Sequence, residues 1–324
     1  MAKKYTFIDL FAGIGGFHYA FHELGAECVF ASEIDTFARK SYEHNLKHIS
    51  PKLFSSNKFN DDILKITYDV IDKEIPDFDI LCAGFPCQPF SQAGFKRGFK
   101  EEKDSRGNMF FKIRDIIKAK KPKAIFLENV RHILKHDDGK TFAIIREIIE
   151  EELGYDFHYE IAKASDFGLP QHRPRLFMIG FRKDSKYKIP FQLPEKMPLK
   201  MTMSDLFGGI CNKKIGYTLR VGGRGSGLND RRNWDSYLVD NRHVRLTPKE
   251  GIIMQGFPKD FIFPVTETQA MKQLGNSVAV NAVKAYGSAI IERLNQEIKS
   301  DRAFLKKHKS NNFSEKKEIL AATV

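Results

Sequence analysis

The sequence predicts an α/β protein built on a doubly wound, Rossmann-like and mostly parallel sheet with helices on both faces. Three observations support this fold class. Short apolar runs alternate with segments of helical periodicity through residues 1–181. The strongest of these runs have the length of buried strands, and glycine or proline ends most of the helical segments. Such alternation is typical of strand–helix–strand units whose strands lie parallel in one sheet.

Each expected element rests on residue types and their spacing. Helix ends are marked by Gly25 after the first helix, Pro122 after the third and Gly154 after the fourth, because proline cannot continue a helix and glycine favours its termination. Expected strands occupy residues 5–10, 27–34, 78–84, 123–130 and 175–181. Expected helices occupy residues 15–24, a segment beginning after Asp35, 108–121 and 141–153.

The sequence changes character after Phe181, where prolines and glycines interrupt it in "IPFQLPEKMP" and "VGGRGSG". Further on, Thr247, Pro248 and Glu250 predict a helix that begins with a capping box. A last long helix is expected at 278–298. We therefore expect a first domain at 1–181, a small, irregular, β-rich and basic domain at 182–262, and a return to the first domain at 263–324 that ends in a basic tail.

Composition indicates a globular protein with a polyanionic partner. Hydrophobic residues make up 42% of the chain and charged residues 29%. The 53 basic and 41 acidic residues give a net charge of +12 and a pI near 9.3. This excess of basic charge favours nucleic acid. A lysine-rich proteome with a solvated basic tail would give the same balance.

The sequence also bears on the cellular compartment. No apolar run approaches the ~20 residues of a membrane span, and no hydrophobic signal segment precedes the first strand. The four cysteines, Cys28, Cys82, Cys87 and Cys211, fit neither a disulfide framework nor paired zinc-ligand spacing. We expect the protein to be located in a reducing cytoplasm and to have no membrane partner.

Polar residues and glycines follow several of the expected strands. Gly13, Gly15 and Gly16 follow the first strand and Glu33 ends the second. In a doubly wound sheet, ligands bind beyond the carboxyl ends of the strands. His18 stands where a dinucleotide fingerprint has its third glycine, which favours a smaller nucleoside ligand with Glu33 on its ribose. The alternative is a tight strand–helix turn with a solvated carboxylate.

The segment "GFPCQPFS" holds a thiol, Cys87, on a loop stiffened by two prolines. Such a loop would hold the Cys87 thiol in place and leave it accessible to a substrate, as a nucleophile requires. The alternative is a buried structural cysteine, which is the commoner role of this residue type. His132 and His172 are possible bases for a thiol hydrolase, but nothing in the sequence pairs either with Cys87. Glu128 ends an apolar strand at the same edge, where burial would raise its pKa; a salt-bridged glutamate is the alternative.

These segments together resemble the DNA (cytosine-5) methyltransferase family. The resemblance covers nearly the whole chain in the family's order, and the irregular basic stretch lies where that family has its variable target-recognition domain. The motifs are "FIDLFAGIGGF", the strand end at Glu33, "DDI" (61–63), "GFPCQPFS" (84–91), "ENV" (128–130), "QHRPR" (171–175), "RLTPKE" (245–250) and "QLGNSV" (273–278).

The resemblance implies catalytic roles that need no metal. Cys87 thiolate would add to carbon 6 of cytosine, so that carbon 5 can accept a methyl group. Glu128 would hold or protonate ring nitrogen 3, and Arg175 would donate to the ring carbonyl. Arg173 would support the site or contact a phosphate.

The implied cofactor is S-adenosyl-L-methionine, which leaves as S-adenosyl-L-homocysteine. Glu33 would bind its ribose, and an acid in "FNDDI" its adenine amine; Asp62 is preferred, with Asp61 as the alternative. The full implied cofactor set is Phe11, Gly13, Gly15, Gly16, Glu33, Ile34, Asp62, Pro86, Asn276 and Ser277.

The implied substrate is double-stranded DNA, from which the target base must be flipped out. Segment 218–235 is the expected sequence reader, and the loop from Cys87 to Gly107 is an expected lid. The alternative for any single arginine of this segment is that it contacts only the DNA backbone. Expected DNA contacts are Gln88, Ser91, Arg106, Arg220, Arg224, Arg231, Arg232 and Arg245.

Three other functions compete with this interpretation. One branch of the same family methylates transfer RNA, although the basic recognition block favours DNA. A DNA-binding protein without catalysis is disfavoured by the intact Cys87, Glu128 and Arg175, and a thiol hydrolase is the third alternative. We expect a bacterial, monomeric enzyme whose restriction endonuclease is a partner only in the genetic sense; an orphan enzyme is the alternative.

Substitution Cys87→Ser tests the nucleophile. We expect turnover to be lost while cofactor binding survives, because the hydroxyl is a much weaker nucleophile than the thiolate but occupies nearly the same space. Transfer of labelled methyl groups and equilibrium binding of S-adenosyl-L-methionine measure the two properties separately. Undiminished transfer would show that Cys87 is not the nucleophile.

Overall fold

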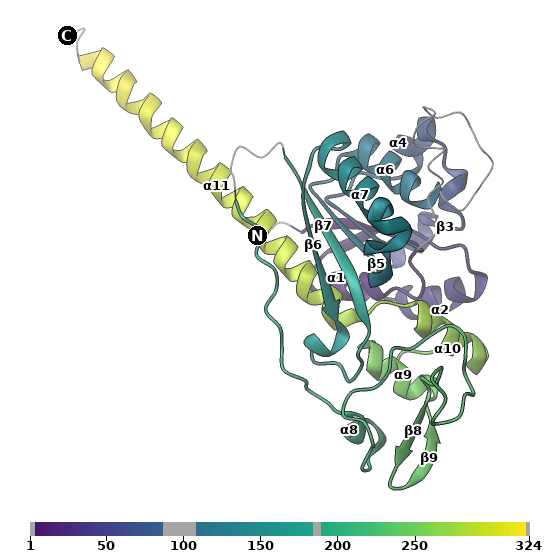
Figure 1. Cartoon of the computed structure of the whole chain (residues 1–324). Helices are drawn as coiled ribbons and strands as arrows, with labels where there is room; N and C mark the ends of the chain where they lie inside the picture. Colours follow the sequence, from purple (N-terminus) through teal and green to yellow (C-terminus); the bar gives the residue numbers. More distant parts are fainter. Residues whose placement is uncertain (1–3, 87–107, 184–188, 322–324) are drawn as a thin grey trace.

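The computed structural model describes residues 4–86, 108–183 and 189–321 of the chain, with side chains as far as residue 300. A seven-stranded sheet forms its centre (Figure 1). The strands are β1 (Thr6–Leu10), β2 (Glu27–Ser32), β3 (Phe59–Asn60), β4 (Ile80–Gly84), β5 (Ala124–Val130), β6 (Tyr155–Lys163) and β7 (Pro174–Arg182).

The strand order is β3-β2-β1-β4-β5-β7-β6. The first five strands in this order are parallel, and β7 runs antiparallel to both β5 and β6. The predicted doubly wound, mostly parallel sheet is therefore confirmed. Chain order reverses between β1 and β4, which is the switch point where ligands bind in such sheets.

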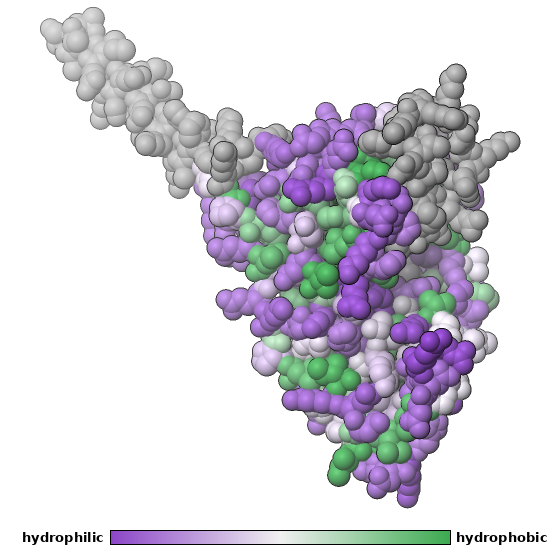
Figure 2. Space-filling view, in the orientation of Figure 1, coloured by the Kyte–Doolittle hydropathy of each residue, from purple (hydrophilic) through white to green (hydrophobic). Residues whose placement is uncertain are grey.

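Strand β6 was not expected from the sequence. Its residues "YDFHYEIAK" alternate between apolar and polar types as far as Ile161, but burial on the apolar face is confined to Tyr155 and Phe157. Tyr159 and Ile161 remain 46% and 41% exposed. Figure 2 shows that apolar residues on the visible face form separate patches among hydrophilic ones. The strand lacks the continuous apolar run by which the buried strands were predicted.

Helices surround the sheet and also form most of the regular structure beyond it. The helices that follow the first five strands are α1 (Gly16–Glu23), α2 (Thr36–Leu46), α3 (Pro51–Ser55), α4 (Ile71–Glu74), α6 (Asn108–Lys120) and α7 (Lys140–Glu147), which continues as a π-helical turn over Ile148–Glu152. The later helices are α8 (Met203–Phe207), α9 (Pro248–Gln255), α10 (Glu267–Asn276) and α11 (Val280–Ala321).

Two hydrophobic cores lie on opposite faces of the sheet. Phe126 of β5 belongs to the core beneath α1 and α11, where it meets Phe17 and Tyr286. Its neighbour Leu127 belongs to the core beneath α6 and α7. Successive residues of a strand point to opposite faces, so one apolar run supplies both cores. This arrangement confirms the prediction of helices on both faces.

The segment after β7 is irregular, as expected, and its regular strands form one hairpin, β8 (Ser236–Val239) and β9 (Arg242–Arg245). Helix α9 begins with the predicted capping box: Glu250 accepts from the Thr247 N–H at 2.8 Å. Helix α11 extends 42 residues, beyond the expected 278–298, and projects from the body (Figure 1). Within the described part of the chain, no helix has the length and apolarity needed to cross a membrane.

His18 predicts a pH dependence of stability. The imidazole is buried, with Nδ1 2.6 Å from Tyr42 Oη and Nε2 2.8 Å from Ser50 Oγ. Burial, with a smaller effect of His22, lowers its pKa to about 3. Between pH 6.5 and 3 the unfolded chain therefore binds one more proton at this position. Its contribution to the free energy of unfolding should fall by about 1.4 kcal/mol for each pH unit that the pH decreases.

Urea denaturation at pH 6.5, 5.5 and 4.5 measures this effect against the variant His18→Asn. The variant loses the local hydrogen bonds, so its stability is lower at every pH. As the pH falls, the free energy of unfolding of the variant should nevertheless decrease less steeply than that of the unmodified protein, by about 1.4 kcal/mol per pH unit. The reason is that the two proteins share all other titrating groups. Parallel curves for the two proteins would contradict the prediction.

Candidate active site

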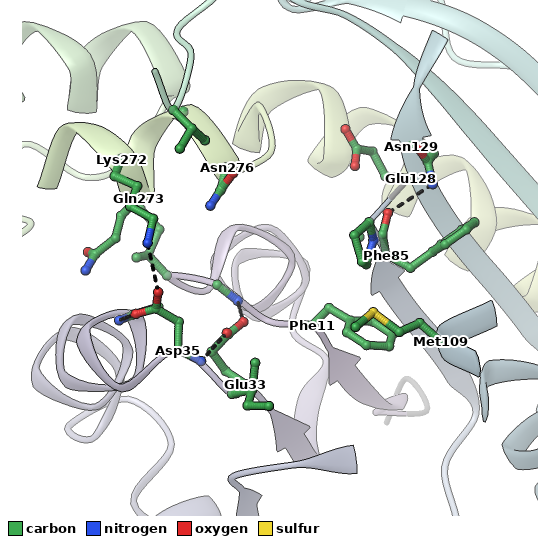
Figure 3. A pocket seen from close by; sticks show the side chains of 18 of the residues that line it. Phe11, Glu33, Asp35, Phe85, Met109, Glu128, Asn129, Lys272, Gln273 and Asn276 are labelled. Carbon is green, nitrogen blue, oxygen red and sulfur yellow. Dashed lines mark hydrogen bonds and ion pairs between the residues drawn. The ribbon is translucent and has the colours of Figure 1, made fainter. Parts of the chain in front are cut away.

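A cavity of about 670 Å³ opens at the switch point, beyond the carboxyl ends of β1, β2, β4 and β5. Figure 3 shows Glu33, Phe11, Glu128 and Asn276 arranged around it. The expected cofactor residues that line the cavity are Phe11, Gly13, Glu33, Ile34, Asp62, Pro86 and Asn276. Seven of the ten residues assigned from the sequence therefore share one cavity, although they come from distant parts of the chain.

Glu33 holds the glycine turn against the end of β2. Its Oε2 accepts a hydrogen bond from Gly13 N at 2.7 Å, and its Oε1 accepts from Asp35 N at 2.8 Å. Burial raises the pKa of the carboxyl group, and the two N–H donors act in the opposite direction. Each carboxylate oxygen has further acceptor capacity, so Glu33 can also accept hydrogen bonds from a ligand in the cavity.

Gly15, Gly16 and Ser277 lie behind the cavity wall. A Cβ on Gly15 would overlap Leu46, and one on Gly16 would overlap Val278. Gly15 also has a φ of 88°, which disfavours side chains. These two glycines allow α2 and the connection between α10 and α11 to pack closely against the turn.

The structure separates the two neighbouring acids in "FNDDI". Asp62 lines the cavity and caps the following turn, accepting from Leu64 N at 3.0 Å. Asp61 is exposed and its carboxylate lies 3.2 Å from Lys65 Nζ. Asp62 is thus the acid that a ligand in the cavity can reach.

Glu128 and Arg175 form a buried ion pair on the same edge of the sheet. The Arg175 Nε lies 2.9 Å from Glu128 Oε1, and the two side chains are only 14% and 10% exposed. Burial raises the pKa of Glu128, while Arg175 and then Arg173 partly offset that effect. Because burial outweighs the two arginines, this carboxyl group takes up a proton more readily than an exposed glutamate does.

Arg173 supports the site from behind. It is fully buried, and its guanidinium donates to the backbone carbonyls of Leu219, Gly275 and Ser277. Its burial leaves no access to a DNA phosphate. Of the two roles expected for Arg173, the supporting one fits this geometry.

Asn129 anchors Phe85, next to Pro86 at the end of the described segment that precedes Cys87. Asn129 Nδ2 donates to the Phe85 carbonyl at 2.9 Å (Figure 3). Gly84 pairs with Glu128 in the sheet. Asn129 belongs to the motif "ENV", which by itself predicted no role for this residue. Cys87, Gln88, Ser91, Arg106 and the expected lid lie outside the described residues.

The arginines expected to contact DNA divide into two groups. Arg224 and Arg245 approach the buried carboxylate of Asp235 at 3.8 and 3.1 Å, and Arg232 lies 2.8 Å from Asp230. The two pairs with Asp235 connect distant parts of this region, whereas the Arg232–Asp230 pair is local and Arg232 is exposed. Arg220, which lines the cavity, and Arg231 are exposed and form no ion pair with other described residues.

Two features of the cavity were not predicted. Lys272 Nζ lies 3.5 Å from Asp35 Oδ2 on one side of it (Figure 3), and no motif in the sequence marked this pair. The recognition segment also contributes a wall through Thr218, Leu219, Arg220 and Val221. The nucleoside-type cavity and the expected DNA reader are therefore in direct contact.

A glycine turn after β1, an acid at the end of β2 and a cavity at the switch point define a nucleoside-binding protein of the doubly wound α/β class. The Glu128–Arg175 pair adds an acid–base group beside that cavity. The cavity and this pair thus lie side by side at one edge of the sheet.

Comparison with known proteins identifies the family. Residues 5–222 and 211–292 match the family described as C-5 cytosine-specific DNA methylase. The chain is 40% identical to the Type II methyltransferase M.SsoII of Shigella sonnei, with 90% of this chain and 81% of that protein covered. Identity to M.HpaII of Haemophilus parainfluenzae is 37%, with 91% of each covered. The chain therefore belongs to this family, and it is a DNA cytosine-5 methyltransferase.

Solved structures support the fold. A putative DNA modification methyltransferase from an E. coli prophage superposes with a TM-score of 0.69 at 21% identity, covering 90% of this chain and all of that one. The S. pombe Dnmt2 methyltransferase gives 0.65 at 18% identity, with 90% and 100% covered. At such identities the likeness concerns the fold alone.

Substitution Gly275→Ala tests the contact between the recognition segment and the cavity. A Cβ on Gly275 would overlap the backbone of Arg220 and Val221. We expect a loss of about 1–3 kcal/mol in the free energy of unfolding, as for other overpacked sites. The control Gly222→Ala places its Cβ in open space at ordinary φ, and it should change stability by less than about 0.5 kcal/mol.

The single tryptophan reports both substitutions. Trp234 is buried and its Nε1 donates to the Gly222 carbonyl at 2.9 Å. Urea unfolding followed by its fluorescence therefore measures stability close to the substituted contact. Equal midpoints for the two variants would refute close packing at Gly275.

Proposed function

We propose that this methyltransferase transfers a methyl group from S-adenosyl-L-methionine to carbon 5 of a cytosine flipped out of duplex DNA, within one recognised sequence. The observation that carries the proposal is the shared edge of the sheet. Glu33 and Asp62 line a cavity of about 670 Å³, and the buried Glu128–Arg175 pair lines the same cavity. Cofactor and base would thus meet between these two pairs of residues.

The cavity fits the chemistry of S-adenosyl-L-methionine. Glu33 can accept hydrogen bonds from ribose hydroxyls and Asp62 from the adenine amine, while Phe11 and Ile34 offer apolar surfaces for the purine. When bound, the cofactor supplies an electrophilic methyl group. Gly13, Pro86 and Asn276 would form the remaining walls, and Gly15, Gly16 and Ser277 would maintain their shape from behind.

Three residues around the cytosine would each contribute to activating its carbon 5. Cys87 thiolate would add to carbon 6, which makes carbon 5 nucleophilic. Glu128 would hold the proton at ring nitrogen 3, which its buried environment favours, and Arg175 would donate to the ring carbonyl. After methyl transfer, a base removes the proton from carbon 5. Elimination of Cys87 then restores the aromatic ring.

We assign DNA recognition to the small domain at 182–262, between the catalytic portions 1–181 and 263–324. Arg220 and Arg231 are its best placed contacts, because both are exposed and neither is paired with another described residue. Flipping a base costs a few kcal/mol, and phosphate contacts by basic residues offset that cost.

We further propose that the enzyme is a monomer of the bacterial cytoplasm that protects host DNA in a restriction-modification system. Support comes from the relatives in Shigella sonnei and Haemophilus parainfluenzae, which are Type II methyltransferases. A cognate endonuclease would then recognise the same sequence without binding this chain.

Bisulfite sequencing of plasmid DNA incubated with purified protein and S-adenosyl-L-methionine tests the proposal. We expect protection of one cytosine within a short repeated sequence. Substitution Glu128→Gln should lower the rate about 10²–10⁴-fold, as expected for loss of a general acid. The exposed Glu147→Gln is the matched control and should retain activity.

Two outcomes would overturn parts of this proposal. If the cofactor binds but no plasmid cytosine is protected, the substrate is not DNA, and transfer RNA becomes the next substrate to assay. If Glu128→Gln retains the rate of Glu147→Gln, then the buried pair does not activate the base.

A further inference from the structure

Three basic side chains gather at the end of the sheet beside the Glu128–Arg175 pair. Arg131 follows Val130 at the end of β5, Lys163 ends β6, and His172 precedes β7. In the sheet, Val130 lies opposite Arg175, and Lys163 lies opposite Pro174. The ends of three neighbouring strands therefore place these basic residues in one strip next to the proposed base-binding site.

Arg131, Lys163 and His172 are all exposed. Neither Arg131 nor Lys163 forms an ion pair or a side-chain hydrogen bond with any other described residue. Asp166 is the acid close enough to act on His172, and it lies 3.6 Å from Lys196. The positive charge of this strip is thus largely uncompensated within the described part of the fold.

The charges in the strip act on one another. Partial burial lowers the pKa of His172, then Lys163 and Arg131 lower it further, and Asp166 opposes them. Mutual repulsion of this kind weakens the folded state and is relieved when an anion binds between the charges. Exposed basic residues at the rim of a site that handles DNA are suited to phosphate groups.

We propose that Arg131, Lys163 and His172 bind phosphates of the DNA substrate. This inference rests on the proposed function and adds a second DNA-binding surface, on the catalytic portion and outside the recognition segment. A phosphate beside His172 favours its protonated form. Binding therefore takes up a proton from solvent, and DNA affinity rises as the pH falls toward 6.

Fluorescence anisotropy with a labelled non-specific duplex tests the strip over a range of salt concentrations. Each lost phosphate contact lowers the slope of log K against log salt by about 0.9. The double variant Arg131→Gln/Lys163→Gln should therefore lose about 1.8 in slope and bind at least tenfold more weakly at moderate salt. Lys52→Gln/Lys73→Gln removes two exposed lysines of α3 and α4 and is the matched control.

His172 has two informative variants. His172→Lys keeps a positive charge that does not titrate near neutrality, so affinity should survive while the pH dependence between 8 and 6 disappears. His172→Gln should lose both. The backbone N–H of His172 donates to the Gly216 carbonyl at 3.0 Å, and neither substitution removes that bond.

The outcomes separate this inference from the proposed function. Equal slopes for the strip variant and the lysine control, or an unchanged pH dependence in His172→Gln, would refute the strip while leaving methylation intact. Failure of the unmodified protein to methylate any DNA would instead refute the proposed function. Cofactor binding serves as the check that each variant is folded and should be unchanged in all of them.

Discussion

The buried guanidinium of Arg173 is the interaction on which the site depends. A buried charge is costly unless its donors are satisfied. Here Nη1 and Nη2 donate to the carbonyls of Leu219, Gly275 and Ser277, while Nε has no partner among the described residues. One side chain thereby joins the start of β7, the recognition segment and the connection between α10 and α11. Gly275 makes this possible, because its missing Cβ admits the backbone of the recognition segment.

The two principal acids of the cavity differ in how they are held. Glu33 accepts two backbone N–H bonds, which favour its charged form against the effect of burial. Glu128 has the charged side chain of Arg175 as its partner, which opposes the same effect of burial on its pKa. One edge of the sheet thus holds two carboxyl groups, one bonded to backbone N–H groups and the other to an arginine. This division suits an enzyme that binds a nucleoside and activates a base in the same cavity.

Sequence motifs predicted several of the residues that line the cavity, but they could not distinguish these from the residues that support it from behind. Glu33 and Glu128 were identifiable because each ends an apolar strand, and such strand ends converge in a parallel sheet. Arg224 and Arg245 could not be separated from Arg220 and Arg231 by sequence, since their partner Asp235 is close to them only in the fold. Strand β6 was missed because an alternation of polar and apolar residues is a weaker sequence signal for a strand than a continuous apolar run.

The sequence by itself determined the strand–helix alternation, the parallel core and the residues that end each strand, because these follow from local periodicity and chain order. Only the tertiary structure decided which residues face the cavity and which support it. Asp62 and Asp61 are adjacent in the chain, yet only Asp62 lines the cavity. The physical reason is that burial and ion pairing arise from contacts between distant segments, such as those that Arg173 makes.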